Sequence, residues 1–403
     1  MRLPPNRPPV KGGAERSEAG DFKTPRRAAL AAPLNRGARR VLLAGALAAI
    51  AVAAGCSTLS YYGQAINGHL DVMRRSEPIA ARIADPATAP ELRLRLERVA
   101  AIRDFSSREL ALPDNGSYRV YADIGRPYVI WNVFAAAEFS VEPRQSCFPV
   151  AGCVAYRGYY AQADAEAYGV GLRKEGHDVH LYGVAAYSTL GWFDDPVLNT
   201  FLRYPDAEVA RLVFHELAHQ VVYVKGDTMF NESFAVAVEE EGVRRWLERS
   251  ATPAERDAYA AARERRHAFV RLVLRHRERL AAFYREPLPE EARRAGKAKR
   301  FAEMDADYRA LKASWGGFAG YDRWFDGGVN NAKLASVATY EELVPAFRAL
   351  LARENGDLPR FYAAVKGLAK LDKPERHAQL AALAGSKPNA DGTGAKITEA
   401  RGE

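Results

Sequence analysis

Cysteine, excess charge and long apolar runs are all scarce in this chain of 403 residues. Its three cysteines are too few for a zinc site made of thiolates alone, which takes four. The formal charge of +8 is unevenly spread: ten Lys and Arg and three acidic residues within residues 1–55 carry +7, which leaves +1 for the remainder. A remainder this close to neutral excludes an extended basic surface, so we expect no nucleic-acid partner.

The longest apolar run, residues 41–55, has fifteen residues, fewer than the roughly 20 of a membrane-spanning helix. Three arginines between residues 36 and 40 precede it and small residues end it, which is typical of an export signal. Residues 53–56, Ala-Ala-Gly-Cys, resemble a bacterial lipobox, which implies cleavage before Cys56 and acylation of that cysteine. An uncut signal anchor and ordinary cleavage nearby are the alternatives. Ser57, where an aspartate would retain such a lipoprotein, favours a periplasmic protein anchored to the outer membrane.

Composition divides the chain into four segments. Residues 1–35 are rich in Pro, Arg and Ala and are expected to be disordered. Residues 36–55 form the predicted lipoprotein signal peptide. Residues 56–385 are expected to fold as a single domain with helical flanks, and residues 386–403 as a disordered tail rich in Gly, Ala, Lys and Asp.

Cys147 and Cys153 are the two cysteines beyond Cys56. Five residues lie between them, including a proline and a glycine, and such a loop can close a disulfide. An exported protein also meets an oxidising compartment in which disulfides persist. Two free thiols and metal ligation are the alternatives, but a zinc site needs more ligands than this pair offers. We therefore predict a Cys147–Cys153 disulfide.

Residues 212–221 read LVFHELAHQV and contain the pattern His215-Glu216-x-x-His219. Two residues four apart on an α-helix project from one face about one turn apart, so both imidazoles can bind one Zn²⁺ ion. Glu216 sits about 100° further round the helix, where its carboxylate can reach a water on the metal without being a ligand. The neighbouring positions are uncharged and mostly apolar, as a buried active-site helix requires. The pattern is typical of metal-dependent peptidases.

Glu232 is the candidate for a third metal ligand, because a catalytic zinc site takes three protein ligands and leaves one position open. Twelve residues separate it from His219, and the polar, glycine-containing residues 224–228 between them predict a turn. The alternative is an exposed carboxylate at a helix N-terminus, which the helix dipole favours. Glu239 lies about two turns further along the same side and could contact a ligand. Glu239, Glu240 and Glu241 are further candidates for the third ligand, but a run of charges is usually a solvated face.

The pattern of apolar residues predicts an α+β fold that is mainly helical. A spacing near 3.6 and alternation with a period of two indicate helices and strands, respectively. The expected fold has a small mixed sheet packed against the helix that carries His215 and His219. Helices are expected over residues 66–83, 91–109, 161–175, 340–353 and 357–369, with long charged helices over 252–310, and strands over 118–123, 128–134, 154–160 and 178–187.

Several strings in the chain match those of one protein family. They are residues 56–59, 61–65, 152–160, 182–193, 214–220, 230–235 and 330–339. Together they resemble the bacterial predicted zinc aminopeptidase lipoproteins over roughly residues 55–370. The resemblance implies a zincin-like fold, a single zinc metallopeptidase domain and aminopeptidase activity. It also implies similarity to zinc peptidases whose glutamate ligand lies in Asn-Glu-x-x-Ala, although the interval from His219 to Glu232 is shorter here than in the best-known members.

Other residues have roles only if this chemistry is correct. Glu216 would act as general base, while a tyrosine would stabilise the oxyanion; Tyr340, Tyr321 and Tyr223 are the candidates. An exopeptidase also needs an acidic group for the substrate amine, for which Glu138 and Glu142 are candidates. The strand predicted over residues 178–187 can pair with an extended peptide, which makes Tyr187 at its end a substrate-binding candidate.

Two other functions remain open at this point. The first is an endopeptidase that acts on periplasmic proteins or on peptidoglycan cross-links. The second is a lipid-anchored binding or scaffold protein in which the zinc is structural. An aminopeptidase would ignore peptides with a blocked N-terminus, and a structural zinc site would have a fourth protein ligand. The expected partners are a peptide substrate and, through the lipid on Cys56, a membrane.

Overall fold

The computed structural model describes residues 60–148 and 152–385. The predicted signal peptide, the candidate lipidation residue Cys56 and both predicted disordered ends lie outside these ranges. The chain divides into two units, residues 1–60 and 61–403, and all structure described below belongs to the second. Within the described ranges, no helix combines the length and the apolar character that crossing a bilayer requires.

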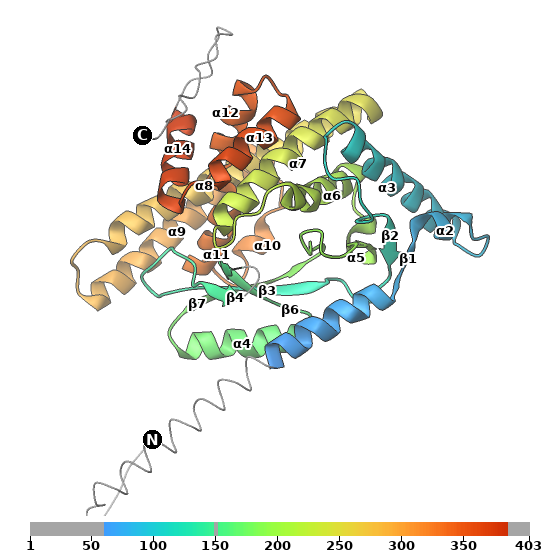
Figure 1. Cartoon of the computed structure of the whole chain (residues 1–403). Coiled ribbons are helices and arrows are strands. Elements are labelled where there is room, and N and C mark those ends of the chain that lie inside the picture. The colour runs from blue at the N-terminus through green and yellow to red at the C-terminus, as the bar shows by residue number, and fades with distance from the viewer. Residues whose placement is uncertain (1–59, 149–151, 386–403) are drawn as a thin grey trace, which may run out of the picture. The chain divides into compact units, whose positions relative to one another are not determined.

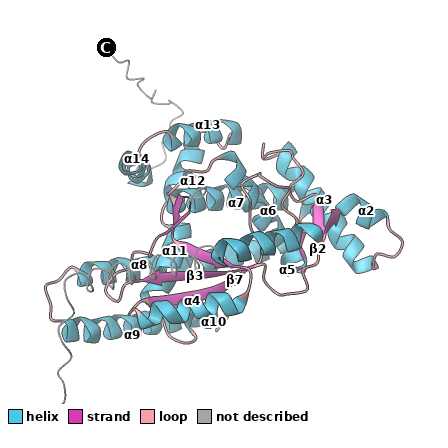
Figure 2. Cartoon of the chain, turned by 60° about the horizontal axis from the view of Figure 1, so that its bottom comes forward, coloured by secondary structure: helices cyan, strands magenta, loops and turns pink. Residues whose placement is uncertain are grey.

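Helices make up most of the described chain, and the strands are short (Figure 2). This confirms the predicted α+β, mainly helical class. Residues 61–74 lie in a helix that is already present at residue 60. The others are α2 (Ile79–Ala84), α3 (Pro90–Arg108), α4 (Gln162–Lys174), α5 (Asn199–Leu202), α6 (Asp206–Val221), α7 (Thr228–Ser250), α8 (Pro253–Tyr284), α9 (Glu290–Ser314), α10 (Asp322–Phe325), α11 (Asn331–Glu341), α12 (Val344–Arg353), α13 (Leu358–Ala369) and α14 (Lys373–Gly385). The strands are β1 (Ser76–Pro78), β2 (Val120–Ala122), β3 (Ile130–Ala136), β4 (Ser146–Phe148), β5 (Gly152–Val154), β6 (Tyr156–Tyr159), β7 (Asp178–Val184) and β8 (Val197–Leu198).

The strands form two small three-stranded sheets and one hairpin. The sheet β1-β2-β8 is mixed, because β2 is antiparallel to β1 and parallel to β8. The sheet β6-β3-β7 is antiparallel throughout, and β4 pairs with β5. The prediction of one helix over residues 66–83 is wrong in one respect. The helix ends at residue 74, the chain then forms β1, and a new helix, α2, starts after Pro78.

Successive side chains of β3 point to opposite faces of the sheet, and the two faces have different neighbours. Val133 and Ala135 point toward α4 and share a buried cluster with its residues Ala165 and Leu172. Asn132 lies on the opposite face and lines a cavity. Figure 1 shows α4 on one side of this sheet and α6 and α7 on the other. The sequence predicted that a sheet packs against the helix that carries His215 and His219. The sheet β6-β3-β7 meets this helix, α6, across a cavity that side chains of both elements line.

The pair α6 and α7 forms the centre of the largest core. Apolar side chains along α6, among them Val213, Phe214 and Leu217, are completely buried. Phe214 packs 6.0 Å from the ring of Phe105 on α3. On the neighbouring helix α7, Gly242 leaves room for the Phe214 side chain. The helix that carries His215 and His219 is consequently fixed by apolar contacts on two sides.

Gly242→Ala should destabilise the protein. An added Cβ would lie 2.7 Å from Phe214 Cδ2 and 2.8 Å from Leu110 Cδ1, and forcing a methyl group into such a packed core costs about 1–3 kcal/mol. In α13, Gly367→Ala is the matched control, since no atom lies within 4 Å of its added Cβ and the better helix former should stabilise by up to about 1 kcal/mol. Urea unfolding measures both changes, and equal stabilisation by the two substitutions would contradict the close packing of α6 on α7.

Candidate metal centre

The turn between α6 and α7 brings the three candidate ligands together. Gly226 adopts φ +81°, a conformation that favours glycine, and Asp227 caps α7 by accepting a hydrogen bond from the Phe230 amide. The Asn231 side chain accepts from the Val224 amide at 2.7 Å and donates to the Val224 carbonyl at 2.9 Å. These contacts fix the start of α7, so that Glu232 in its first turns faces α6. The turn predicted from the sequence is confirmed.

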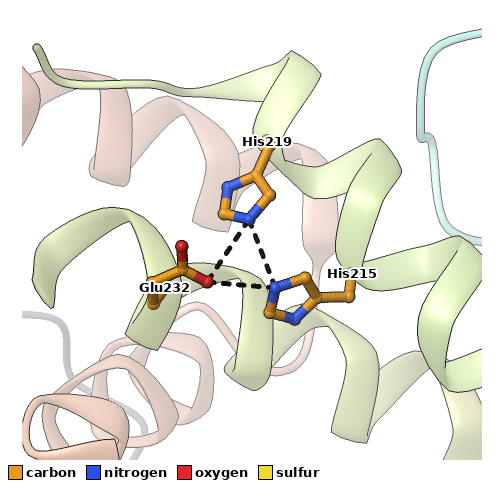
Figure 3. Close-up of side chains that lie close together, drawn as sticks. All are labelled: His215, His219 and Glu232. Carbon is orange, nitrogen blue, oxygen red and sulfur yellow. Dashed lines mark hydrogen bonds and ion pairs between the residues drawn. The ribbon is translucent and has the colours of Figure 1, made fainter. Parts of the chain in front are cut away.

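The ligand atoms of His215, His219 and Glu232 form a compact triangle (Figure 3). His215 Nε2 lies 3.2 Å from His219 Nε2 and 3.2 Å from Glu232 Oε2, and the third side, from His219 Nε2 to Glu232 Oε2, is 3.6 Å. A tetrahedral zinc ion with ligands at about 2.0–2.2 Å holds neighbouring ligand atoms about 3.3–3.6 Å apart. The spacing and the donor set of two nitrogens and one oxygen therefore fit zinc.

Glu239 orients one of these ligands. Its Oε2 lies 2.8 Å from His215 Nδ1, and because a carboxylate only accepts, Nδ1 carries the hydrogen and Nε2 points to the triangle. Glu239 is completely buried and is also paired with Arg211 and Arg266, each at 3.3 Å. The contact to His215 is the one suggested by its position on the helix. His219 has no such support among the described residues, none of which forms a hydrogen bond with its buried Nδ1.

The metal-free triangle holds an internal ion pair. Burial lowers the pKa of His215, but hydrogen bonds to Glu232 and Glu239 outweigh burial and raise it to about 10. Burial raises the pKa of Glu232, but the charge of His219 and the hydrogen bond from His215 outweigh it and lower that pKa to about 2. A metal ion must displace the proton on His215, so its affinity should fall as pH falls.

A cavity of about 830 Å³ lies against the triangle. Its walls come from the helix at residues 61–74, from β3, β6 and β7, and from α6, α7 and α11. Glu216 lies in this wall beside the ligands, and burial raises the pKa of its carboxyl. The volume suits a short stretch of peptide rather than a single ion.

The candidate substrate and oxyanion residues divide into two groups. Tyr340, Tyr223 and Tyr187 line the cavity. Tyr321 is elsewhere, stacked 4.2 Å from the ring of Phe269 in a separate core.

The acidic candidates for binding a substrate amine are not among the cavity-lining residues. Glu138 accepts hydrogen bonds from Arg294 at 2.7 and 3.1 Å, and Glu142 is paired with Arg277 at 2.7 Å. The structure thus brings the three candidate metal ligands, Glu216, Tyr340 and Tyr187 together around one cavity, and places Glu138 and Glu142 outside it.

Sequence reasoning missed a group of polar side chains on the sheet. Tyr182 hydrogen bonds with Tyr340 and Asn132, and burial raises its pKa to about 12. Tyr156 stands close enough for the Glu232 charge to add to the effect of burial, which raises its pKa well above the usual range. The alternation of side chains along the predicted strands could have revealed this group, because Tyr182 and Asn132 occupy paired positions of β7 and β3 and therefore share a face.

The predicted disulfide between Cys147 and Cys153 is present and links β4 to β5. Phe148 and Val154, the neighbours of the two cysteines, line the cavity. Phe148 stacks 5.4 Å from the ring of Tyr61 in the first helix. The disulfide therefore fixes a hairpin that forms part of the cavity wall.

Comparison with known protein families gives a match. The family model described as "Putative aminopeptidase" matches residues 60–380, most of the chain. The chain belongs to this family. Among curated proteins no match is found, and no solved structure matches either. Membership in the family supports peptidase activity at a general level, and the matched range contains every residue of the triangle and of the cavity described above.

Glu239→Gln should weaken metal binding, because the neutral amide no longer balances the partial charge that His215 gains on binding a cation. Loss of such a supporting contact typically costs about 10- to 100-fold in metal affinity. The control is Glu240→Gln at the next position, whose carboxylate instead pairs with Arg348 and His267. Competition with a chromogenic zinc chelator measures both affinities. Equal affinity for the wild type and the Glu239 variant would show that this contact does not support the site.

Proposed function

We propose that the protein is a zinc-dependent peptidase, and within that class an aminopeptidase. The observation that supports this most strongly is the triangle of His215, His219 and Glu232, with the carboxylate of Glu216 beside it in one cavity. These three residues would hold the zinc ion. Bound there, zinc would lower the pKa of a water molecule and polarise the scissile carbonyl. The cluster of described residues has three ligands, and a tetrahedral ion has four positions. This favours an enzyme over a scaffold with structural zinc.

Glu216 is the residue that moves protons. A carboxylate next to the ligands can accept a proton from the attacking water and later deliver it to the departing amine. Burial raises the pKa of Glu216, which brings it closer to that of the groups with which it exchanges protons. Its place one residue after His215 keeps it near the metal position without being part of the ligand triangle.

Tyr340 is the donor that the cavity offers to a developing oxyanion. Its ring centre lies 6.4 Å from that of His215, and burial raises the pKa of its hydroxyl well above the usual range, so the proton stays available for donation. Ser233 on α7 positions it: the Ser233 hydroxyl donates to the Tyr340 carbonyl at 3.2 Å. Tyr182, its hydrogen-bond partner, would hold the hydroxyl in place.

Endopeptidase activity is the second candidate, and one observation favours it. Glu138 and Glu142 lie outside the cavity, while Glu239, a carboxylate inside it, is held by His215 and two arginines. The other two carboxylates in the wall, Glu216 and Glu232, have the roles proposed above, so an amine of a substrate would have to be bound by tyrosine hydroxyls or backbone carbonyls. Tyr187 lies in the wall beside β7, in a position to contact an extended peptide.

The location of the protein is also a proposal. The lipobox-like residues 53–56 support export and attachment by lipid at Cys56. The disulfide is compatible with an oxidising compartment such as the periplasm. In this account the mature protein stands on the periplasmic face of the outer membrane.

Glu216→Gln should reduce peptide hydrolysis by at least about 100-fold while the metal stays bound, because the amide cannot accept a proton. Glu208→Gln on the same helix is the control, since Glu208 pairs with Arg211 and is not in the cavity wall. Initial rates on a peptide mixture and zinc content by mass spectrometry are measured together. A Glu216 variant with wild-type rates would remove the general-base role.

The protein should hydrolyse peptides with a free N-terminus but not peptides with an acetylated N-terminus. If the protein is an aminopeptidase, it releases single residues from the free peptides and leaves the acetylated ones intact, because binding of the amine contributes to recognition. Chromatography of the products with time identifies each cleavage. Internal cleavage of acetylated peptides at comparable rates would instead establish the endopeptidase.

A further inference from the structure

The surface next to the cavity carries four exposed apolar side chains from two elements. Ile66 and Leu70 are one turn apart in the helix at residues 61–74, with exposed fractions of 58% and 42%. Trp192 and Phe193 lie in the loop before β8 and are 75% and 52% exposed. Ordinary surface apolar residues are scattered singly, whereas a group like this marks an interaction site. We call Ile66, Leu70, Trp192 and Phe193 the apolar patch.

His69 shows that the two parts of the patch are in contact. Its ring centre lies 4.6 Å from that of Phe193, and in the helix it is three residues after Ile66, a spacing at which side chains are neighbours on the helix surface. Its Nδ1 hydrogen bonds with the Tyr187 hydroxyl at 3.1 Å. Burial lowers the pKa of His69, so the centre of the patch is uncharged at neutral pH. The patch is thus continuous and suited to an apolar neighbour.

The position of the patch in the chain indicates which neighbour this is. Five residues lead from Cys56 to Tyr61, and a chain of that length reaches at most about 18 Å. If Cys56 carries lipid, Tyr61 must therefore lie within that distance of the bilayer surface. Ile66 is only five residues further on, about 8 Å along a helix.

We propose that the apolar patch docks on the surface of the bilayer to which Cys56 is attached. The chemistry agrees: tryptophan is enriched at the boundary between headgroups and acyl chains, and aliphatic and phenyl groups gain by leaving water there. This inference rests on the proposed lipidation and not on the peptidase chemistry. A second contact beside the anchor would fix the orientation of the protein as well as its attachment.

The docked orientation would place the cavity next to the membrane. The two elements that carry the patch also line the cavity, through Tyr61 and Tyr62 in the helix and Ser188 and Leu190 in the loop. The polypeptides that reach the cavity most readily are then those that lie close to the lipid surface. Substrates of this class would include the ends of membrane-attached proteins.

The test uses the full-length protein, expressed with its own signal, purified from membranes and reconstituted in phosphatidylethanolamine–phosphatidylglycerol vesicles. Phe193→Cys is labelled with an environment-sensitive fluorophore, and quenching by phospholipids with brominated acyl chains is measured. Phe318→Cys is the matched control, because Phe318 is also a partly exposed phenylalanine, 42%, but lies between α9 and α10. Trp192→Cys gives an independent reading of the patch should the first variant fold poorly.

If the proposal is correct, the labels at positions 193 and 192 are quenched roughly twofold more than the label at 318, as expected for a group at the headgroup boundary. Vesicle flotation is recorded in parallel. Protein that floats but shows equal quenching at 193 and 318 would overturn the docking while leaving the lipid anchor intact. Protein that does not float would overturn both, with peptide hydrolysis unaffected. Protection of the 193 label by soluble peptide alone would make the patch a substrate surface instead.

Discussion

Two imidazoles and a carboxylate, held within 3.6 Å of one another in a buried site, set the constraint on which the rest of this structure depends. Polar groups are costly to bury unless each has a partner. Here the partners come from a second layer in which Glu239 accepts from His215 and pairs with Arg211 and Arg266. Arg266 pairs in turn with Glu341 at 2.9 Å. Four helices, α6, α7, α8 and α11, thus contribute charge to one site.

The same helices also fix the position of the cavity wall. The Ser233 hydroxyl on α7 donates to the Tyr340 carbonyl and accepts from the Leu343 amide at 3.3 Å, which links the helix that carries Glu232 to the end of α11. At the start of α7, Asp227 accepts from Arg376 at 2.9 and 2.8 Å, which attaches α14 to the same turn. The site is therefore connected to distant parts of the chain through backbone and charged contacts.

Much of this site follows from local sequence. Helix periodicity alone places His215 and His219 on one face, and a glycine-containing turn returns Glu232 to them. Strand alternation and the loop between the cysteines correctly predicted β3, β7 and the disulfide. These features depend on residues close together in the chain, where spacing determines geometry.

Features built from distant segments could not be predicted in this way. The long charged helices expected over residues 252–310 gave no sign that Arg266 of α8 would line the cavity. Glu240, in an acidic run expected to be solvated, is 7% exposed because Arg348 from another helix pairs with it. The amine-binding role given to Glu138 rested on closeness in sequence to the strands, and its Arg294 partner comes from α9. In each case the deciding partner lies in a distant element.

The central claim is that the triangle binds a catalytic zinc ion, and metal content measured together with activity tests it most directly. The account predicts about one zinc per chain in the purified protein, loss of peptide hydrolysis on removal with a chelator, and recovery on addition of zinc. Undiminished hydrolysis by protein shown to be free of metal would contradict it.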